Sequence, residues 1–220
     1  MNEPTEDRLA GLMCSAQRFH KKKARSFWEE YARSDDAEEV SMDPMLFMVV
    51  REPPAPAGGD GIGAAGPEPG EKTQGEEEGG PTENIYSAPA PEGGPGKTRA
   101  EAFRKLGAAL TEVVEGRLLV VTLVAEAWHA RLSPQKADRC KRGEERWPQV
   151  SKMDNRREIV IVNSLTRDGQ SVASCAEVRR SLAGEATLAR EWKDTWKDSS
   201  DETPQSRLLE NVFAGANLRS

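Results

Sequence analysis

The sequence contains three cysteines and two histidines, too few for several common kinds of site. Cys14, Cys140 and Cys175 are far apart and odd in number, and none belongs to a Cys-x-x-Cys pair. A disulfide framework and a zinc ribbon are therefore not expected. His20 and His129 share no metal-ligand spacing with any cysteine. We expect a chain without a metal or cofactor, in a reducing compartment such as the cytoplasm.

Long apolar runs are also absent. The most apolar stretch, 118–125, is far too short to cross a bilayer, so no membrane span is expected. The acidic N-terminus has no apolar region of the kind found in signal peptides. The net charge of −6 argues against a general nucleic-acid coat, although a local basic patch is compatible with it.

The apolar share of 36% is low and the charged share of 31% is high for a packed globule. Much of the reason is local, because 12 of the 19 glycines and 9 of the 14 prolines lie between Pro53 and Gly96. Such a segment buries little surface and is expected to stay disordered. This composition predicts an N-terminal helical appendage (1–50), a disordered Gly/Pro/Glu-rich linker (51–97), an α+β domain (98–214) and a short tail (215–220).

The first 50 residues hold two apolar segments. Apolar residues at spacings of three and four predict an amphipathic helix over 5–33, with basic side chains on its opposite face. That basic face fits either a phosphate or anionic membrane surface or plain solvent, and the apolar stripe then covers the domain or a partner. The segment 42–50, MDPMLFMVV, fits either a strand or a peptide that docks on a partner. Its methionines suit an adaptable contact surface as well as a core.

The second half begins with a helix predicted over 98–115. Thr98 and Glu101 have capping-box spacing at its start, and Gly116 follows as a C′ residue. The stretch 117–130 is predicted to be the central strand, because leucine and β-branched residues dominate its first half. Alternation of side chains predicts that one face of this strand is buried throughout. The other face, which carries Leu118 and Glu126, is predicted to be buried only at the start of the strand.

Three further strands and a helix follow a long polar loop. A strand over 158–165 leads into a hairpin at Asp168-Gly169, whose partner strand covers 171–179. A fourth strand is expected over 186–193 and a terminal helix over 204–214. The predicted fold class is α+β, a small antiparallel sheet of three to four strands flanked by two helices, with the helical appendage and disordered linker in front.

The order of these elements carries a resemblance. A helix, an apolar strand ending in AEAW, a charged loop, an REIVIV strand and a DG hairpin resemble small uncharacterised α+β proteins of bacterial and phage genomes. The resemblance covers residues 98–214, and it implies no activity, because none is attached to that group.

The loop 131–157 is the strongest candidate site. It carries nine basic and four acidic residues, a net charge of +5. The binding candidates in it are Arg139, Lys141, Arg142, Arg146 and Trp147. Lysine and arginine can neutralise phosphates while tryptophan stacks on a base, so a nucleic acid is one ligand. The same residue types are favoured in contacts with proteins, so an acidic protein partner is another, and an ordinary solvated loop is the third interpretation.

The end of the central strand adds Glu126 and Trp128 as candidate binding residues. They share a strand face, whereas His129 points to the other. A carboxylate beside a tryptophan can act as an acid, but this arrangement is more typical of packing, with Glu126 paired to a loop cation.

Two enzymatic patterns are weaker. The segment 93–98, GGPGKT, matches the end of a phosphate-binding loop, yet Pro91 replaces the first glycine and SAPAPEGG does not resemble a preceding strand. Cys140 lies among basic residues that favour a reactive thiolate. We therefore expect a non-enzymatic interaction or accessory protein, with nucleic-acid binding through the loop 131–157 as the alternative and a small P-loop-like nucleotide-binding enzyme as a third.

Overall fold

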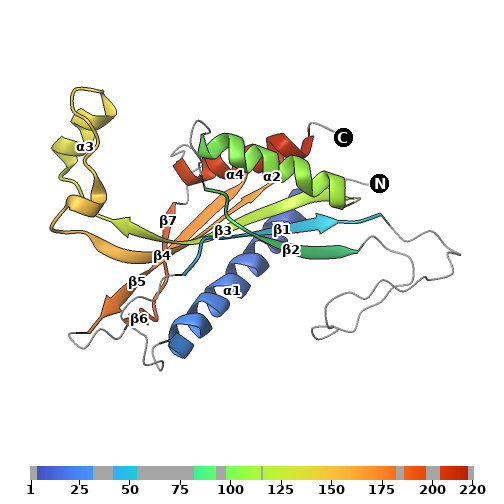
Figure 1. Cartoon of the computed structure of the whole chain (residues 1–220), viewed down its shortest axis with the longest axis horizontal. Coiled ribbons are helices and arrows are strands. Elements are labelled where there is room, and N and C mark those ends of the chain that lie inside the picture. Colours follow the sequence, from blue (N-terminus) through green and yellow to red (C-terminus); the bar gives the residue numbers. More distant parts are fainter. Residues whose placement is uncertain are drawn as a thin grey trace, which may run out of the picture.

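The computed structural model shows a curled antiparallel sheet between two helical layers (Figure 1). It describes residues 4–31, 42–53, 82–92, 98–114, 116–181, 186–196 and 204–217. The helices are α1 (Glu6–Tyr31), α2 (Arg99–Val113), α3 (Pro134–Lys141) and α4 (Pro204–Ala216), with a 3₁₀ turn, η2 (Val150–Lys152). The strands are β1 (Met45–Arg51), β2 (Glu83–Pro89), β3 (Arg117–His129), β4 (Arg157–Thr166), β5 (Ser171–Arg180), β6 (Ala186–Leu188) and β7 (Lys193–Trp196).

The sheet is larger than the three to four strands predicted. Its order is β2-β1-β3-β4-β5-β6, and β7 pairs with β5 beside β6. Every neighbouring pair is antiparallel. The α+β class is confirmed, and the extra strands come from the first half of the chain and from a split of the predicted strand 186–193 into β6 and the start of β7.

Strand β1 accounts for one of the additional strands. It lies between β2 and β3, and Leu46, Met48 and Val50 are almost completely buried. Of the two interpretations of the apolar segment 42–50, a strand or a docking peptide, the strand is therefore correct. Its run of consecutive apolar residues is explained by its position, because a strand inside a sheet that is covered on both faces has no side exposed to water.

Strand β2 lies within the segment predicted to be a disordered linker. The strand was not predicted because the composition was taken over the whole Gly/Pro-rich range 53–96, in which the short stretch ENIYSAP contributes little. An edge strand also tolerates Pro89, whose missing N–H weakens an internal ladder. The rest of the predicted linker, 54–81 and 93–97, lies outside the described residues.

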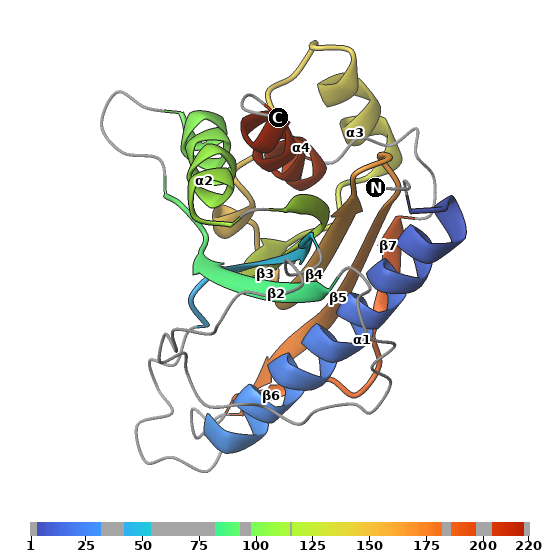
Figure 2. The same ribbon diagram turned by 90° about the vertical axis from the view of Figure 1, so that its right-hand side faces the viewer.

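Helix α1, in the predicted appendage 1–50, packs on the sheet, so its apolar stripe covers the domain, one of the two surfaces left open. Its apolar side chains Leu9, Met13 and Trp28 are at most 4% exposed. Figure 2 shows the helix running diagonally across the sheet face opposite α2 and α4. Two buried clusters join it to strands β1, β3, β4, β5 and β6. The spacing predicted the helix correctly, but a periodic pattern does not say which surface its apolar stripe covers.

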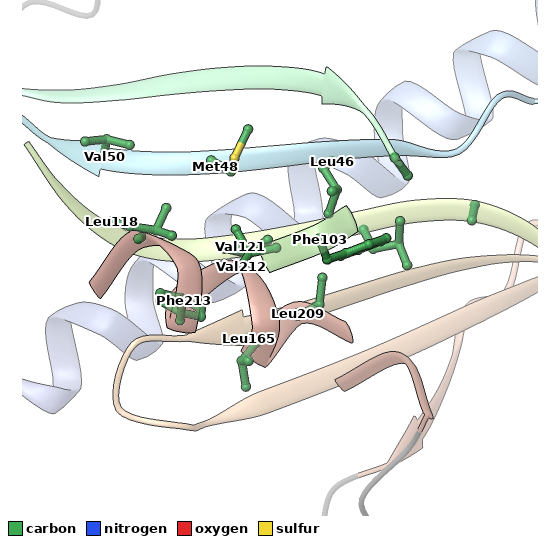
Figure 3. Close-up of a cluster of buried hydrophobic side chains, with 14 of the residues drawn as sticks. Leu46, Met48, Val50, Phe103, Leu118, Val121, Leu165, Leu209, Val212 and Phe213 are labelled. Carbon is green, nitrogen blue, oxygen red and sulfur yellow. The ribbon is translucent and has the colours of Figure 1, made fainter. Parts of the chain in front are cut away.

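The main core lies between the sheet and the pair α2–α4 (Figure 3). Phe103 from α2 and Leu209 and Val212 from α4 are completely buried there. They meet inward side chains of β1, β3 and β4, such as Leu46 and Val121. The two helices expected to flank the sheet therefore share one face of it.

The central strand β3 is buried on both faces from Leu118 to Ala125. A bulge at Leu119 interrupts its register with β1, since Val49 pairs with Val120 and Val50 with Leu118. The extra residue places Leu118 in the α2–α4 core instead of on the face predicted by strict alternation. The face predicted to stay buried throughout is also only half-buried at its far end, at Ala127.

The ends of α2 give one confirmation and one correction. Thr98 and Glu101 form the predicted capping box. Gly116, in contrast, does not have the positive φ of a C′ glycine. It is needed for close approach, because a Cβ there would lie 2.6 Å from Val50 Cγ1. The hairpin at Gly169 is as predicted, with φ of 89°.

Candidate functional site

The predicted basic loop forms a small lobe, residues 130–156, which projects from the body of the molecule (Figure 1). The distal ends of β3 and β4 carry it. Exposure rises along β3 toward this end, so that Trp128 is 49% exposed although Ala125 is buried. The lobe therefore begins where the two helical layers no longer cover the sheet.

Helix α3 gives the lobe its internal order. Ser133 caps it by accepting a hydrogen bond from Lys136 N, and Pro134 occupies the first turn, as the Ser-Pro pair indicates. Gly143 ends it with φ of 74°. Cys140 is 5% exposed and its Sγ donates to the carbonyl oxygen of Arg146 at 3.6 Å. A buried thiol of this kind packs the lobe, and its burial does not support the reactive-thiol hypothesis.

Two contacts hold the base of the lobe. Asn155 Nδ2 donates to Arg131 O at 2.8 Å, which joins the incoming and outgoing chain. The guanidinium of Arg156 lies over the Trp128 ring, 5.3 Å from its centroid. Neither Asn155 nor Arg156 was among the predicted site residues. The only signal in the sequence was their position just before β4, opposite the end of β3.

The acidic side chains of the lobe pair with some of its cations. Glu145 lies 3.6 Å from Lys136 Nζ and 3.3 Å from Arg139 Nη2. Glu144 accepts two hydrogen bonds from Arg142, the shorter of 2.6 Å from its Nε. This contact lowers the pKa of the Glu144 carboxyl and raises that of the Arg142 guanidinium. Both predicted binding residues, Arg139 and Arg142, are therefore already engaged within the lobe.

The remaining predicted residues of the lobe are available at its surface. Lys141 and Arg146 are exposed and have no ion pair among the described residues. Trp147 is 60% exposed, which is unusual for so large a hydrophobic side chain. An exposed tryptophan beside unpaired cations is the arrangement expected of a contact surface.

Glu126 and Trp128 share a face of β3 as predicted, but they act separately. Glu126 accepts a hydrogen bond of 2.8 Å from the backbone N–H of Met42. It thus ties the segment before β1 to the sheet, and Arg180 of β5 lies near it. The pKa of Arg180 is raised mainly by its hydrogen bond to Glu158, and the charge of Glu126 adds to this effect.

Trp128 stacks under Arg156 at the base of the lobe. The second carboxylate nearby is Glu158, the cross-strand partner of Trp128, whose Oε1 lies 2.7 Å from Arg180 Nη2. Glu126 and Glu158 thus both lie near the Arg180 guanidinium, as in a structural ion-pair cluster.

The nucleotide-binding pattern lies mostly outside the described residues, which omit 93–97. Thr98 caps α2. Contrary to expectation, a strand does precede the pattern, but β2 is an edge strand paired antiparallel to β1. Phosphate-binding loops follow a parallel strand inside the sheet, so this topology does not support the pattern.

Metal ligands are not grouped within the ranges that the structure describes, where no set of three or more His, Cys, Asp or Glu side chains is placed to hold an ion. None of the helices described is both long enough and apolar enough to cross a membrane.

The chain matches no protein-family model, and the searches of curated proteins and of solved structures found no similar protein. The likeness of residues 98–214 to small bacterial and phage proteins thus stays a prediction.

Proposed function

We propose that this chain is a non-enzymatic interaction protein of the cytoplasm that binds an acidic surface of a protein partner through the lobe 130–156. The observation that carries the proposal is the exposure of Trp147, which follows Arg146 in the chain and shares with Lys141 a lobe that projects from the body. Tryptophan and arginine supply much of the binding energy in protein interfaces, because they combine a large apolar area with directional hydrogen bonding.

The charge pattern of the lobe favours a protein over a nucleic acid. Glu144 and Glu145 are interleaved with its cations and pair with Lys136, Arg139 and Arg142. A surface that tracks a phosphate backbone needs a row of unpaired cations, since affinity grows with the number of phosphates neutralised. A mixed-sign surface around one exposed aromatic is instead typical of selective protein contacts.

The test uses fluorescence anisotropy with the full-length chain and two labelled probes. One is an acidic peptide of alternating glutamate and leucine, which offers carboxylates to Lys141 and Arg146 and apolar side chains to Trp147. The other is a single-stranded DNA oligonucleotide. We expect the peptide to bind, and Trp147→Ala and the double variant Lys141→Ala/Arg146→Ala each to weaken it by roughly tenfold.

The matched control is Arg104→Ala/Lys105→Ala, which removes two exposed cations from α2 and should leave the affinity unchanged. If the control variant lost as much affinity for the peptide as the lobe variants, the binding would depend only on the net charge of the chain. Binding of the DNA alone, weakening steeply with salt, would replace the protein partner with a nucleic acid.

A further inference from the structure

Strand β2 forms an edge of the sheet, and no other strand among the described residues pairs with its outer side (Figure 2). Its register with β1 decides which of its backbone groups face outward. Glu52 N donates to Thr82 O at one end and Ala90 N donates to Pro44 O at the other. Because hydrogen-bonded pairs alternate along an antiparallel ladder, the even-numbered residues of β2 bond to β1.

The odd-numbered residues of β2 therefore direct their backbone groups away from the sheet. Glu83, Ile85 and Ser87 each offer an N–H and a C=O, whereas Pro89 offers a C=O alone. The outward set is thus centred on Ile85, with one complete residue on each side of it. Such a row of unpaired groups is a template for another strand.

The side chains along this edge do not oppose an incoming strand. Edge strands are commonly protected by charges that repel a neighbour. The one charge in β2, Glu83, is already paired with Arg8 at 2.8 Å and with Arg51 at 2.9 Å. Ile85 is 60% exposed, so a large apolar side chain lies at the middle of the edge.

We propose that the occupant of this edge is β2 of a second copy of the chain, paired antiparallel about a two-fold axis through Ile85. In this register Ile85 exchanges both hydrogen bonds with Ile85 of the second copy. Glu83 pairs in the same way with Ser87 of the second copy. The two sheets then join into one continuous sheet across the dimer.

Two copies of this edge are complementary to each other in their backbone groups and in their charges. The outward backbone groups of β2 are arranged symmetrically about Ile85. Two identical edges can therefore form all their hydrogen bonds with each other, and every N–H donor between residues 83 and 87 finds an acceptor. Pro89, which lacks an N–H, falls outside this paired segment. A parallel in-register pair would place Glu83 against itself, whereas the antiparallel pair places it opposite a neutral serine.

Sedimentation equilibrium of the full-length chain tests the proposal over about 1 µM to 1 mM protein. Wild-type chain is expected to dimerise, and Ile85→Lys and Ile85→Glu each to raise the dissociation constant by roughly tenfold or more, because like charges then face each other. A mixture of the two variants should dimerise again, since lysine and glutamate meet only if residue 85 faces its own counterpart.

Val113→Lys serves as the matched control, because Val113 is 83% exposed and lies on α2, outside the sheet. It should leave the dissociation constant unchanged. A wild-type chain that stays monomeric at the highest concentration overturns the proposal. So does a dimer that Ile85→Lys leaves intact, or a mixture of the two charged variants that stays monomeric.

Discussion

Gly107 of α2 and Gly215 of α4 are each pressed against the backbone of the opposite helix. A Cβ on Gly107 would lie 2.0 Å from the carbonyl oxygen of Val212, and a Cβ on Gly215 would lie 1.9 Å from that of Arg104. The relationship is reciprocal, so the two helices approach as closely as their backbones allow. This contact sets the height of the α2–α4 layer, and with it the depth at which Phe103 and Leu209 enter the core.

Gly107→Ala and Gly215→Ala are expected to destabilise the chain by about 1–3 kcal/mol each, because the added methyl forces the helices apart. The result opposes intrinsic helix propensity, which favours alanine over glycine by about 1 kcal/mol. Urea unfolding measures the change. Gly11→Ala is the control, since nothing lies within 4 Å of a Cβ at that exposed position of α1. It should stabilise the chain, and equal destabilisation at all three positions would contradict the role of the contact.

The docking of α1 depends on a buried amide. Gln17 Nε2 donates to Val162 O at 3.1 Å, to Ser164 Oγ at 2.9 Å and to Val172 O at 3.0 Å. Gln17→Leu should destabilise the chain by about 1–3 kcal/mol, because it leaves buried acceptors without a donor. Gln135→Leu, at an exposed position of α3, is the matched control and should change the unfolding free energy by less than about 0.5 kcal/mol.

The same amide predicts coupling across 147 residues of sequence. In a double-mutant cycle with Ser164→Ala, the two substitutions should be less than additive, by about 0.5–1.5 kcal/mol, since each removes the same hydrogen bond. Strict additivity would show that Gln17 acts only through the two carbonyl groups.

His20 makes the stability of the α1 interface depend on pH. It is 2% exposed and stacks on Phe47, with ring centroids 3.9 Å apart. Burial lowers its pKa from 6.5 to about 4. The unfolded chain therefore binds a proton more readily than the folded chain between these values, and stability present above pH 6.5 is lost as the pH falls toward 4.

The measurement is the unfolding free energy of wild type and of His20→Phe at pH 7 and at pH 4. Relative to wild type, His20→Phe should gain about 3 kcal/mol between the two conditions, because phenylalanine has no proton to bind. Because both chains contain the same carboxylates, the contribution of these groups to the pH dependence of stability cancels in the comparison. His129→Phe, at an exposed position, is the control. A relative gain as large for His129→Phe would mean that burial of His20 is not the cause.

The fold was predictable where a residue's role depends on its immediate neighbours. Thr98 caps α2, Gly169 turns the hairpin, and Ser133-Pro134 begins α3, because caps and turns are decided within four residues. Strand β2 was missed and the surface covered by α1 was left open, because both depend on distant partners. The bulge at Leu119 was also not predictable from local sequence, since it is defined by how β3 pairs with β1.

The sequence predicted which region forms the candidate site, but not which of its charged side chains are free of ion pairs within the lobe. Net charge and Trp147 identified the lobe correctly as an exposed, basic segment. The sequence did not reveal that Arg139 and Arg142 pair within it while Lys141 does not, because α3 and the turn after it decide which charges meet. Arg156 stacks on Trp128 through pairing between β3 and β4, which no local pattern encodes.

Glu145 limits the positive charge that the lobe can offer, since it holds Lys136 and Arg139 at 3.6 and 3.3 Å. Glu145→Gln should therefore tighten binding of the acidic peptide by roughly three- to tenfold and steepen its salt dependence, because two cations are released. Stability should change by less than about 1 kcal/mol, since all three side chains are partly exposed. Glu210→Gln on α4 makes the same change of net charge at an exposed site and controls for it. Anisotropy at low and high salt measures the difference, and equal affinities of the two variants would mean that Lys136 and Arg139 take no part in binding.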